Sequence, residues 1–334
     1  MHFLVTGGSG FVGGNLARLL CGRGHTVTAL VRRSSNRAAL EKLGGVRLAY
    51  GDLATGEGLD EALAGVDCVQ HVAGVTKAWT PEEYHRGNAE GTRLLCQAMA
   101  RQAKVPRLVY CSSLAAAGPA TVGKPRKETD AVAPVSMYGR SKLSAELAVR
   151  QFADRVPSVV VRPPFVYGPG DSVNLPPLMA MGRFGVYLKA GLGPKHFSFI
   201  HVEDLCEALL AASTKGKTLQ PGSESEGVYF VADPDQYSWE DFCQALSAAM
   251  GKGRPRVIPL PEIFGYAAGI GSEIGARFRG APPIVSRDKA REMRCEAWTC
   301  ASDRARQEID FSAAFPLAEG LLNTVAWYRK EGWL

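Results

Sequence analysis

The sequence predicts an α/β fold, a Rossmann-type doubly wound parallel sheet followed by a smaller, mostly helical C-terminal domain. Three observations support this prediction. Short apolar and β-branched runs alternate with longer helical patterns as far as residue 162, which is the rhythm of βαβ units. A glycine-rich turn at residues 6–13 follows the first of these runs. Beyond residue 170 the alternation stops, and proline and glycine crowd the chain as far as Pro194.

Six runs have the length and composition of buried strands, at residues 2–6, 26–32, 46–50, 68–72, 107–112 and 158–162. Helical patterns separate them, and the clearest of these lie at residues 11–21, 83–103 and 136–152. Parallel strands require long crossover connections, which these helices supply. We therefore expect six parallel strands with helices on both faces of the sheet.

Two further strands are expected at residues 197–201 and 228–231, each followed by a helical pattern. This order predicts a dinucleotide-binding domain of residues 1–170 that also receives about 197–235. The remaining segments, 171–196 and 236–334, would then form a substrate-binding cap over the carboxyl edge of the sheet.

The composition argues against several classes of protein. The net charge of +6 is spread among 33 acidic residues, so nucleic acid is not the expected partner. Eight cysteines show neither a CxxC pair nor metal-ligand spacing with histidine, which predicts reduced thiols, no metal and a cytoplasmic location. The first residues already form a strand pattern, and no run is long and apolar enough for a membrane span.

The turn Thr6-Gly-Gly-Ser-Gly-Phe-Val-Gly13 has the spacing Gly-x-x-Gly-x-x-Gly between a strand and a helix. Glycines there permit a tight turn, a close approach of the backbone to a diphosphate, and close packing of helix on strand. A glycine-rich turn that binds nothing is the alternative. The residues expected to hold a dinucleotide are Gly7, Ser9, Gly10, Phe11, Val12 and Gly13.

The end of the second strand indicates which dinucleotide is used. An NAD site would normally place a carboxylate there, whereas this chain has Arg32 and Arg33. A guanidinium group can bind a 2′-phosphate through two hydrogen bonds. We therefore expect NADP(H) bound by Arg32, with NAD(H) as the second choice if both arginines are only solvated surface charges.

Two more strand ends lie on the same carboxyl edge, where a doubly wound sheet binds its ligand. Asp52 and Leu53 follow the third strand, and Val72, Ala73 and Gly74 follow the fourth. We expect all five to line the dinucleotide. Asp52 could equally be a helix cap.

A tyrosine and a lysine four residues apart, Tyr138 and Lys142, share one face of a predicted helix. A lysine cation and the positive nicotinamide ring both favour a phenolate. Such a phenol can give or take the proton that accompanies hydride transfer. The sequence thus predicts an oxidoreductase centre at Tyr138 and Lys142.

In combination these motifs resemble the extended short-chain dehydrogenase/reductases, the NAD-dependent epimerase/dehydratase family. The resemblance covers nearly the whole chain and rests on eight ordered motifs, at 7–13, 51–53, 71–74, 88–92, 111–113, 138–142, 162–170 and 199–204.

The resemblance implies several roles. Ser113 would orient the reacting oxygen beside Tyr138, with Ser112 as the second choice. Lys142 would also hold the nicotinamide ribose, and Pro163 and Val166 would line the nicotinamide. Asn88 would support a proton-relay water or serve a purely structural purpose, and His201 would secure a loop without taking part in catalysis.

Three chemistries share this scaffold. A 4,6-dehydratase would carry an acidic pair after the active serine, where this chain has Leu114 and Ala115. A nucleotide-sugar epimerase stays an alternative, although Arg32 and the sequence from Lys195 to Ser198 depart from its usual pattern. A cofactor-binding regulator that senses NADP(H) without turnover is a second alternative. The presence of all three residues Ser113, Tyr138 and Lys142 argues against it, because a sensor needs no proton donor.

The preferred interpretation is that the protein is a reductase or dehydrogenase similar to 3β-hydroxysteroid dehydrogenases and dihydroflavonol reductases. Its bulky apolar substrate would contact Ser112 and Asn88 and an apolar wall that includes Leu175, Met179 and Tyr187. Ile263, Phe264, Tyr266 and Ile270 would complete a lid. Decarboxylation through a substrate carboxylate on Lys189 or Lys195 is a further option. The resemblance also suggests a homodimer through a four-helix interface formed by helices 83–103 and 136–152.

Overall fold

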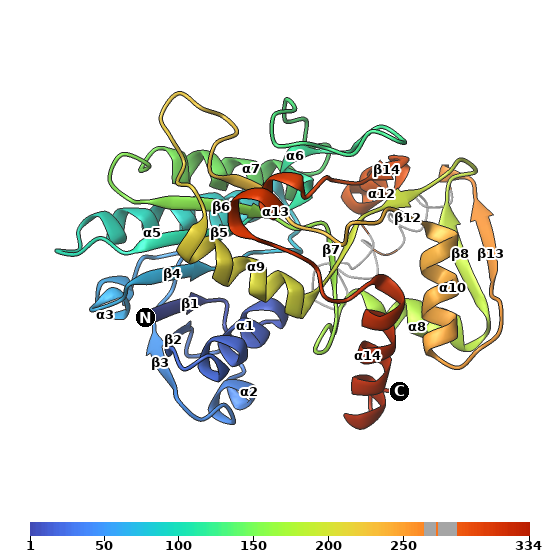
Figure 1. Ribbon diagram of the computed structural model, residues 1–334, viewed down its shortest axis with the longest axis horizontal. Coiled ribbons are helices and arrows are strands. Elements are labelled where there is room, and N and C mark those ends of the chain that lie inside the picture. The colour runs from blue at the N-terminus through green and yellow to red at the C-terminus, as the bar shows by residue number, and fades with distance from the viewer. Residues whose placement is uncertain (264–271, 273–285) are drawn as a thin grey trace.

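A computed structural model describes residues 1–263, 272 and 286–334, and its centre is a seven-stranded sheet. Every neighbouring pair of strands in that sheet is parallel. The predicted doubly wound fold is confirmed, with the expected run at 228–231 supplying the seventh strand (Figure 1). Across the sheet the strands are β11 (Val228–Phe230), β6 (Ser158–Arg162), β5 (Arg107–Cys111), β4 (Cys68–His71), β1 (His2–Thr6), β2 (Thr26–Val31) and β3 (Val46–Tyr50).

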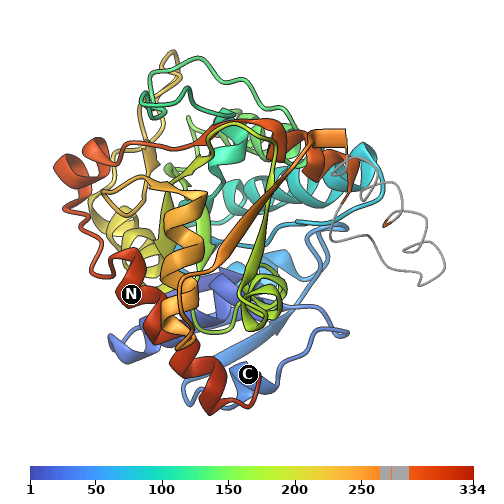
Figure 2. The same ribbon diagram turned by 90° about the vertical axis from the view of Figure 1, so that its right-hand side faces the viewer.

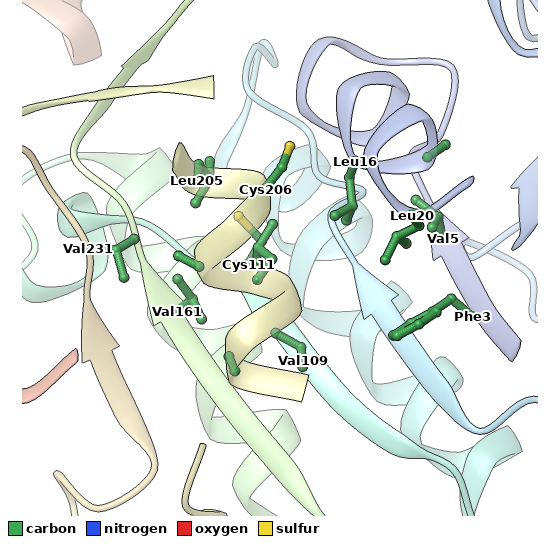
Figure 3. Close-up of a cluster of buried hydrophobic side chains, with 14 of the residues drawn as sticks. Phe3, Val5, Leu16, Leu20, Val109, Cys111, Val161, Leu205, Cys206 and Val231 are labelled. Carbon is green, nitrogen blue, oxygen red and sulfur yellow. The ribbon is translucent and has the colours of Figure 1, made fainter. Parts of the chain in front are cut away.

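Helices cover both faces of the sheet because each strand is apolar on both sides. On one face α1 (Phe11–Gly22) and α9 (Val202–Lys215) pack over a continuous cluster of buried side chains. Figure 3 shows this cluster, in which Leu16 and Leu20 of α1 and Leu205 of α9 lie over Val5, Val109 and Val161 of the sheet. The other face is covered by α3 (Leu59–Leu63), α5 (Gly91–Ala100) and α7 (Met137–Arg150).

The helix expected at 83–103 is divided into three segments. These are α4 (Pro81–Tyr84), a π-helical segment η1 (His85–Glu90) and α5. Inside η1 the Asn88 side chain bonds the backbone of Val75 through both its oxygen and its nitrogen. A π-helical turn is frequent at functional sites, and here it points one polar side chain at the loop after β4.

The expected strand at 197–201 is broken into β9 (His196–Phe197) and β10 (Phe199–His201). β10 pairs with β7 (Phe165–Tyr167) beside the main sheet, whereas β9 pairs with β12 (Tyr237–Ser238) and β14 (Ala297–Trp298) in the cap. The chain therefore changes sheets at Ser198, whose N–H donates to the carbonyl of Trp298 at 2.9 Å.

The cap, which faces the viewer in Figure 2, has a cluster of buried apolar side chains. Its elements are α8 (Leu175–Arg183), β8 (Val186–Ala190), α10 (Trp239–Ala249), β13 (Arg256–Leu260), α12 (Arg287–Arg294) and α14 (Leu317–Lys330). One segment of the expected cap lies elsewhere, because α13 (Asp303–Ile309) packs on α9 and β11. Its Ala305 and Ile309 belong to the core of the main sheet.

Among the described residues, no helix combines the length and the apolar character that crossing a membrane requires.

Candidate active site

The glycine turn lies where the strand order reverses, between β1 and β4. Gly7 has a φ of 72°, which favours glycine, and a side-chain carbon there would approach the Cα of Ala73 to 2.8 Å. At Gly13 an added carbon would collide with the carbonyl oxygen of Gly7. The turn therefore packs backbone to backbone on α1 and on the loop after β4. Val72 and Ala73 are partly buried beside it, and Gly74 is exposed.

The N-terminus of α1 fits a diphosphate group. Gly10 is its N-cap, and no side chain in the described part of the protein caps it. Its first N–H groups, from Phe11 to Gly13, therefore point past Gly10 with the positive end of the helix dipole. Asn15 donates to the carbonyl of Pro169 at 2.9 Å, which fixes the 168–170 loop beside this helix end.

Basic side chains gather at the end of β2. Arg32 is exposed and begins a turn, in which its N–H bonds the Ser35 hydroxyl at 3.2 Å. The guanidinium groups of Arg33 and Arg37 lie 5.3 and 5.6 Å from the ring centroid of Tyr50. Arg33 is thus stacked on an aromatic ring while Arg32 stands apart from it.

Asp52 and Leu53 follow β3 at the same edge. The Asp52 carboxylate accepts the N–H of Ala54 at 2.8 Å, so it closes its own turn. Leu53 is half-buried and lies against Gly91 at the start of α5. A structural role for Asp52, which the sequence left open, is therefore visible in its own hydrogen bonds.

Tyr138 and Ser113 meet because two helices approach closely. Ser113 is the N-cap of α6 (Leu114–Ala117), and Tyr138 is the second residue of α7. A side chain at Gly139 would collide with the carbonyl oxygen of Ala115, so glycine permits this contact between the helices. The Ser113 side chain lies close to the phenol of Tyr138 and acts to lower its pKa.

Ser112, the second candidate, is turned away from this pair. It is buried, and its hydroxyl donates to Glu146 Oε1 at 2.5 Å. Glu146 also forms a buried ion pair with Arg162, with Nη2 to Oε2 at 2.5 Å. Ser112, Glu146 and Arg162 thus join α7 to the ends of β5 and β6.

Lys142 is buried one turn beyond Tyr138. Its Nζ donates to the carbonyl of Cys111 at 2.8 Å and lies 4.4 Å from the ring centroid of Tyr110. Burial lowers the pKa of Lys142 to about 8, although nearby Cys111 and Glu146 oppose the shift. The ammonium group is held at the strand end with little solvent around it.

Burial also raises the pKa of Tyr138 above its ordinary value, and the negative charge of Glu292 adds to this. The nearby Ser113 side chain acts in the opposite direction and lowers the pKa of Tyr138. The lower pKa that we expected from Lys142 is not found in the protein alone, because desolvation by burial is the largest influence on the pKa of Tyr138. The phenol is therefore protonated at neutral pH and available as a proton donor.

Asn88 is fully engaged with the protein. Besides its bonds to Val75, it donates to the Ser141 hydroxyl at 2.8 Å, and Ser141 donates to the carbonyl of Tyr138 at 2.7 Å. On its other side Thr92 links the Asn88 carbonyl to His71. Asn88 thus ties the loop after β4 to the helix that carries Tyr138.

Pro163 and Val166 lie at the end of β6 and in β7, on the same edge as Ser113. The carbonyl of Pro163 accepts the N–H of Leu114 at 2.8 Å, which joins this segment to α6. Val166 is half-buried against the core that includes α1. Pro163 is thus held beside α6, and Val166 beside the core that α1 covers.

The expected apolar wall is mostly internal to the cap. Leu175, Met179 and Tyr187 are buried and pack with Phe242 and Leu321. We therefore leave them out of the proposed substrate site. Ile263 is 73% exposed, and the other expected lid residues, Phe264, Tyr266 and Ile270, lie outside the described residues.

The two lysines considered for a substrate carboxylate are also engaged. Lys195 Nζ donates to the carbonyls of Met293, Arg294 and Cys295 at 2.8, 2.9 and 3.2 Å, at the end of α12. Lys189 pairs with Glu240 at 2.7 Å.

Two carboxylates that sequence reasoning missed lie on the N-terminus of α7. Asp288 Oδ1 accepts the N–H of Met137 at 2.8 Å, and Glu292 Oε1 accepts the Ser136 hydroxyl at 2.7 Å. Negative charge at a helix N-terminus is stabilising. Asp288 lies 150 residues after Tyr138, so the sequence does not reveal this contact. The one available signal is the four-residue spacing of Asp288 and Glu292, which places both on one face of a helix.

Known proteins resemble this chain throughout its length. Residues 3–226 match the model of the NAD dependent epimerase/dehydratase family. Ceramide reductase of Caulobacter vibrioides is 32% identical over 337 residues, covering 99% of this chain and 95% of that protein. The 4-hydroxy-2-methyl-3-oxo-4-farnesyl-3,4-dihydroquinoline-1-oxide ketoreductase of Stigmatella aurantiaca is 31% identical, covering 96% and 95%. The crystal structure of gox2253 has a TM-score of 0.80 at 30% identity, covering 99% and 98%.

The buried charge of Lys142 predicts a stability change with a defined pH dependence. A pKa of about 8 in the folded protein, below the ordinary 10.5, means that folding disfavours the charged form. At about 1.4 kcal/mol per pH unit, the cost below pH 8 is roughly 3 kcal/mol, and it disappears between pH 8 and 10.5. Lys142→Met should therefore raise the free energy of unfolding by about 1–3 kcal/mol at pH 7 and much less at pH 10. Urea unfolding of both proteins at the two pH values measures this, and an equal difference at both would contradict it.

Asp288 should act by positioning Tyr138. Asp288→Ala removes the acceptor for Met137 and should lower kcat about fivefold to tenfold, with little change in dinucleotide affinity. Asp288→Asn keeps an oxygen acceptor and should retain most of the activity. Steady-state kinetics and a binding titration of both variants distinguish these outcomes. If Asp288→Asn and Asp288→Ala lower kcat equally, the hydrogen bond to Met137 does not account for the loss.

Proposed function

This chain belongs to the NAD dependent epimerase/dehydratase family, and on that premise we propose that it is an NADP(H)-dependent oxidoreductase that reduces a ketone on a bulky, apolar substrate. One observation carries the proposal. Tyr138 lies one helical turn from the buried ammonium group of Lys142, and Ser113 is close enough to the Tyr138 phenol to lower its pKa.

The chemistry divides between the dinucleotide and the protein. A bound nicotinamide supplies or accepts the hydride at the substrate carbon. Ser113 and Tyr138 would bind the carbonyl oxygen, and Tyr138 would donate its proton to that oxygen as the alcohol forms. Lys142, whose ammonium group lies at the end of β5, would bind the ribose and stabilise the resulting phenolate.

We propose that the reaction runs in the direction of reduction. Burial keeps Tyr138 protonated, which suits a group that begins the reaction as an acid. The two relatives described above are named as reductases.

The substrate class is supported by those relatives and by the site. Ceramide and a farnesylated quinoline are bulky and largely apolar, and the names of the two relatives contain them. Directly after Ser113 this chain carries the buried apolar helix Leu114–Ala117, with no acid for a dehydration. We therefore propose a lipid-like ketone with one polar group at the reacting carbon.

Two observations weigh against the nucleotide-sugar epimerase. Lys195, near the place where such enzymes carry an arginine for the diphosphate, is buried and bonded to α12. The end of β2 presents Arg32 in place of a carboxylate. The sensor alternative has less support because a protein without turnover has no need of Ser113, Tyr138 and Lys142 together. A homodimer, a cytoplasmic location and coupled decarboxylation stay predictions.

Tyr138→Phe tests the proposed reaction. The variant loses only the proton donor, so turnover of NADPH with a ketone panel should fall at least about a thousandfold. Dinucleotide affinity, measured by fluorescence titration, should change less than threefold. Substantial activity in this variant would overturn the proposal, and loss of both properties would indicate misfolding. Ser112→Ala is the matched control, because Ser112 donates to Glu146 and should affect stability more than turnover.

Arg32→Ala tests the dinucleotide preference. A charge-assisted hydrogen bond to a 2′-phosphate contributes roughly 1.5–3 kcal/mol, so the Kd for NADPH should rise about tenfold to a hundredfold. The Kd for NADH should barely change, since it has no such phosphate. Arg33→Ala is the control, because Arg33 stacks on Tyr50. Equal effects of Arg32→Ala on both dinucleotides would show that Arg32 is not a ligand of the phosphate.

A further inference from the structure

The cap presents an exposed apolar sheet face that the proposed reaction does not use. In the two-stranded sheet of β8 and β13, Leu188 lies beside Ile258. Tyr187, on the opposite face of β8, is fully buried in the cap core. Because side chains alternate along a strand, Leu188 and Ile258 point outward, and they are 44% and 43% exposed.

Large exposed apolar side chains also flank the two strands in the sequence. Phe184, just before β8, is 85% exposed, and Leu192 and Ile263, just after the two strands, are 72% and 73% exposed. Among the large apolar residues that the structure describes, these three are the most exposed. We call Phe184, Leu188, Leu192, Ile258 and Ile263 the outer cap face. Single exposed apolar residues are ordinary, but a group of them indicates an interaction surface.

Basic residues surround one end of the outer cap face. Arg183 precedes Phe184, and the N–H of Arg256 bonds the carbonyl of Gly185 at 2.8 Å, which brings the starts of β8 and β13 together. Lys252 and Arg254 lie in the loop that leads into β13. All four basic side chains are exposed, and none forms an ion pair within the described part of the chain. Figure 2 shows β8 and β13 on the side of the cap that faces the viewer.

We propose that the outer cap face docks on an anionic lipid bilayer, with Phe184, Leu188 and Ile258 entering the interface and the four cations binding lipid headgroups. A bilayer offers an apolar layer beneath negative charge, which matches an apolar face beside a basic cluster. A second copy of this chain is the other possible occupant, and the test below distinguishes it from a bilayer.

The docking does not depend on the proposed reaction, because it involves neither the glycine turn nor Tyr138. It does offer a simple route for a lipid-like substrate, since such molecules concentrate in bilayers. The outer cap face belongs to the domain that also supplies Asp288 and Glu292 to the catalytic helix.

Co-sedimentation of the full-length protein with vesicles tests the proposal. The protein should bind vesicles of phosphatidylcholine with 30% phosphatidylglycerol, bind pure phosphatidylcholine vesicles roughly tenfold or more weakly, and detach as salt is raised. The variant Lys252→Glu with Arg254→Glu should lose at least tenfold in affinity. Phe184→Ser with Leu192→Ser should lose a similar factor on the anionic vesicles. These positions are exposed, so the fold should persist, and circular dichroism checks it.

A matched control uses the exposed segment 121–127. Lys124→Glu with Lys127→Glu changes the net charge by the same amount as the basic variant, and Val122→Ser removes an exposed apolar side chain. These controls should bind vesicles as the wild type does. The proposal is overturned if the wild type ignores anionic vesicles, if the controls lose as much affinity as the variants, or if light scattering shows that the outer cap face instead joins two copies. Reduction of a water-soluble ketone measures the proposed reaction without vesicles. Failure of the docking proposal can therefore be told apart from failure of the proposed function.

Discussion

The buried ion pair between Glu146 and Arg162 is the contact on which the site depends. It joins the middle of α7 to the carboxyl end of β6, and Ser112 at the end of β5 completes it. Removing one partner would leave an unpaired buried charge, which typically costs 3–5 kcal/mol. Tyr138 and Lys142 lie on the same helix as Glu146. This ion pair therefore fixes the position of both side chains relative to the carboxyl ends of β5 and β6.

The same edge receives the other half of the site. The reversal of strand order between β1 and β4 leaves room for the glycine turn, whose backbone packs directly on Ala73. A polar chain from Thr6 through His71, Thr92 and Asn88 to Ser141 connects the two halves beneath the surface. Burial lowers the pKa of His71 to about 3. The histidine is therefore neutral, and the network stays fixed over the physiological pH range.

The cap contributes in two directions. Toward the sheet, α12 places Asp288 and Glu292 on the first turn of α7, and Lys195 holds the far end of α12 through three carbonyls. Away from the sheet, β8 and β13 expose apolar side chains beside four cations that form no ion pair with the residues that the structure describes. The cap thus contacts the helix that carries Tyr138 through α12. Its outer cap face points away from that helix.

The sequence determined whatever depends on local pattern. Alternating apolar runs predicted the six strands, and the glycine spacing predicted the turn at Gly7. The four-residue spacing predicted that Tyr138 and Lys142 share one helix face. Only the tertiary structure decided which polar groups meet across long separations. It turned Ser112 toward Glu146 and Ser113 toward Tyr138, and it packed Leu175, Met179 and Tyr187 inside the cap. It also brought Asp288 to a helix 150 residues earlier in the chain. Packing between distant segments sets these choices, and a side chain's type and spacing carry no information about its distant neighbours.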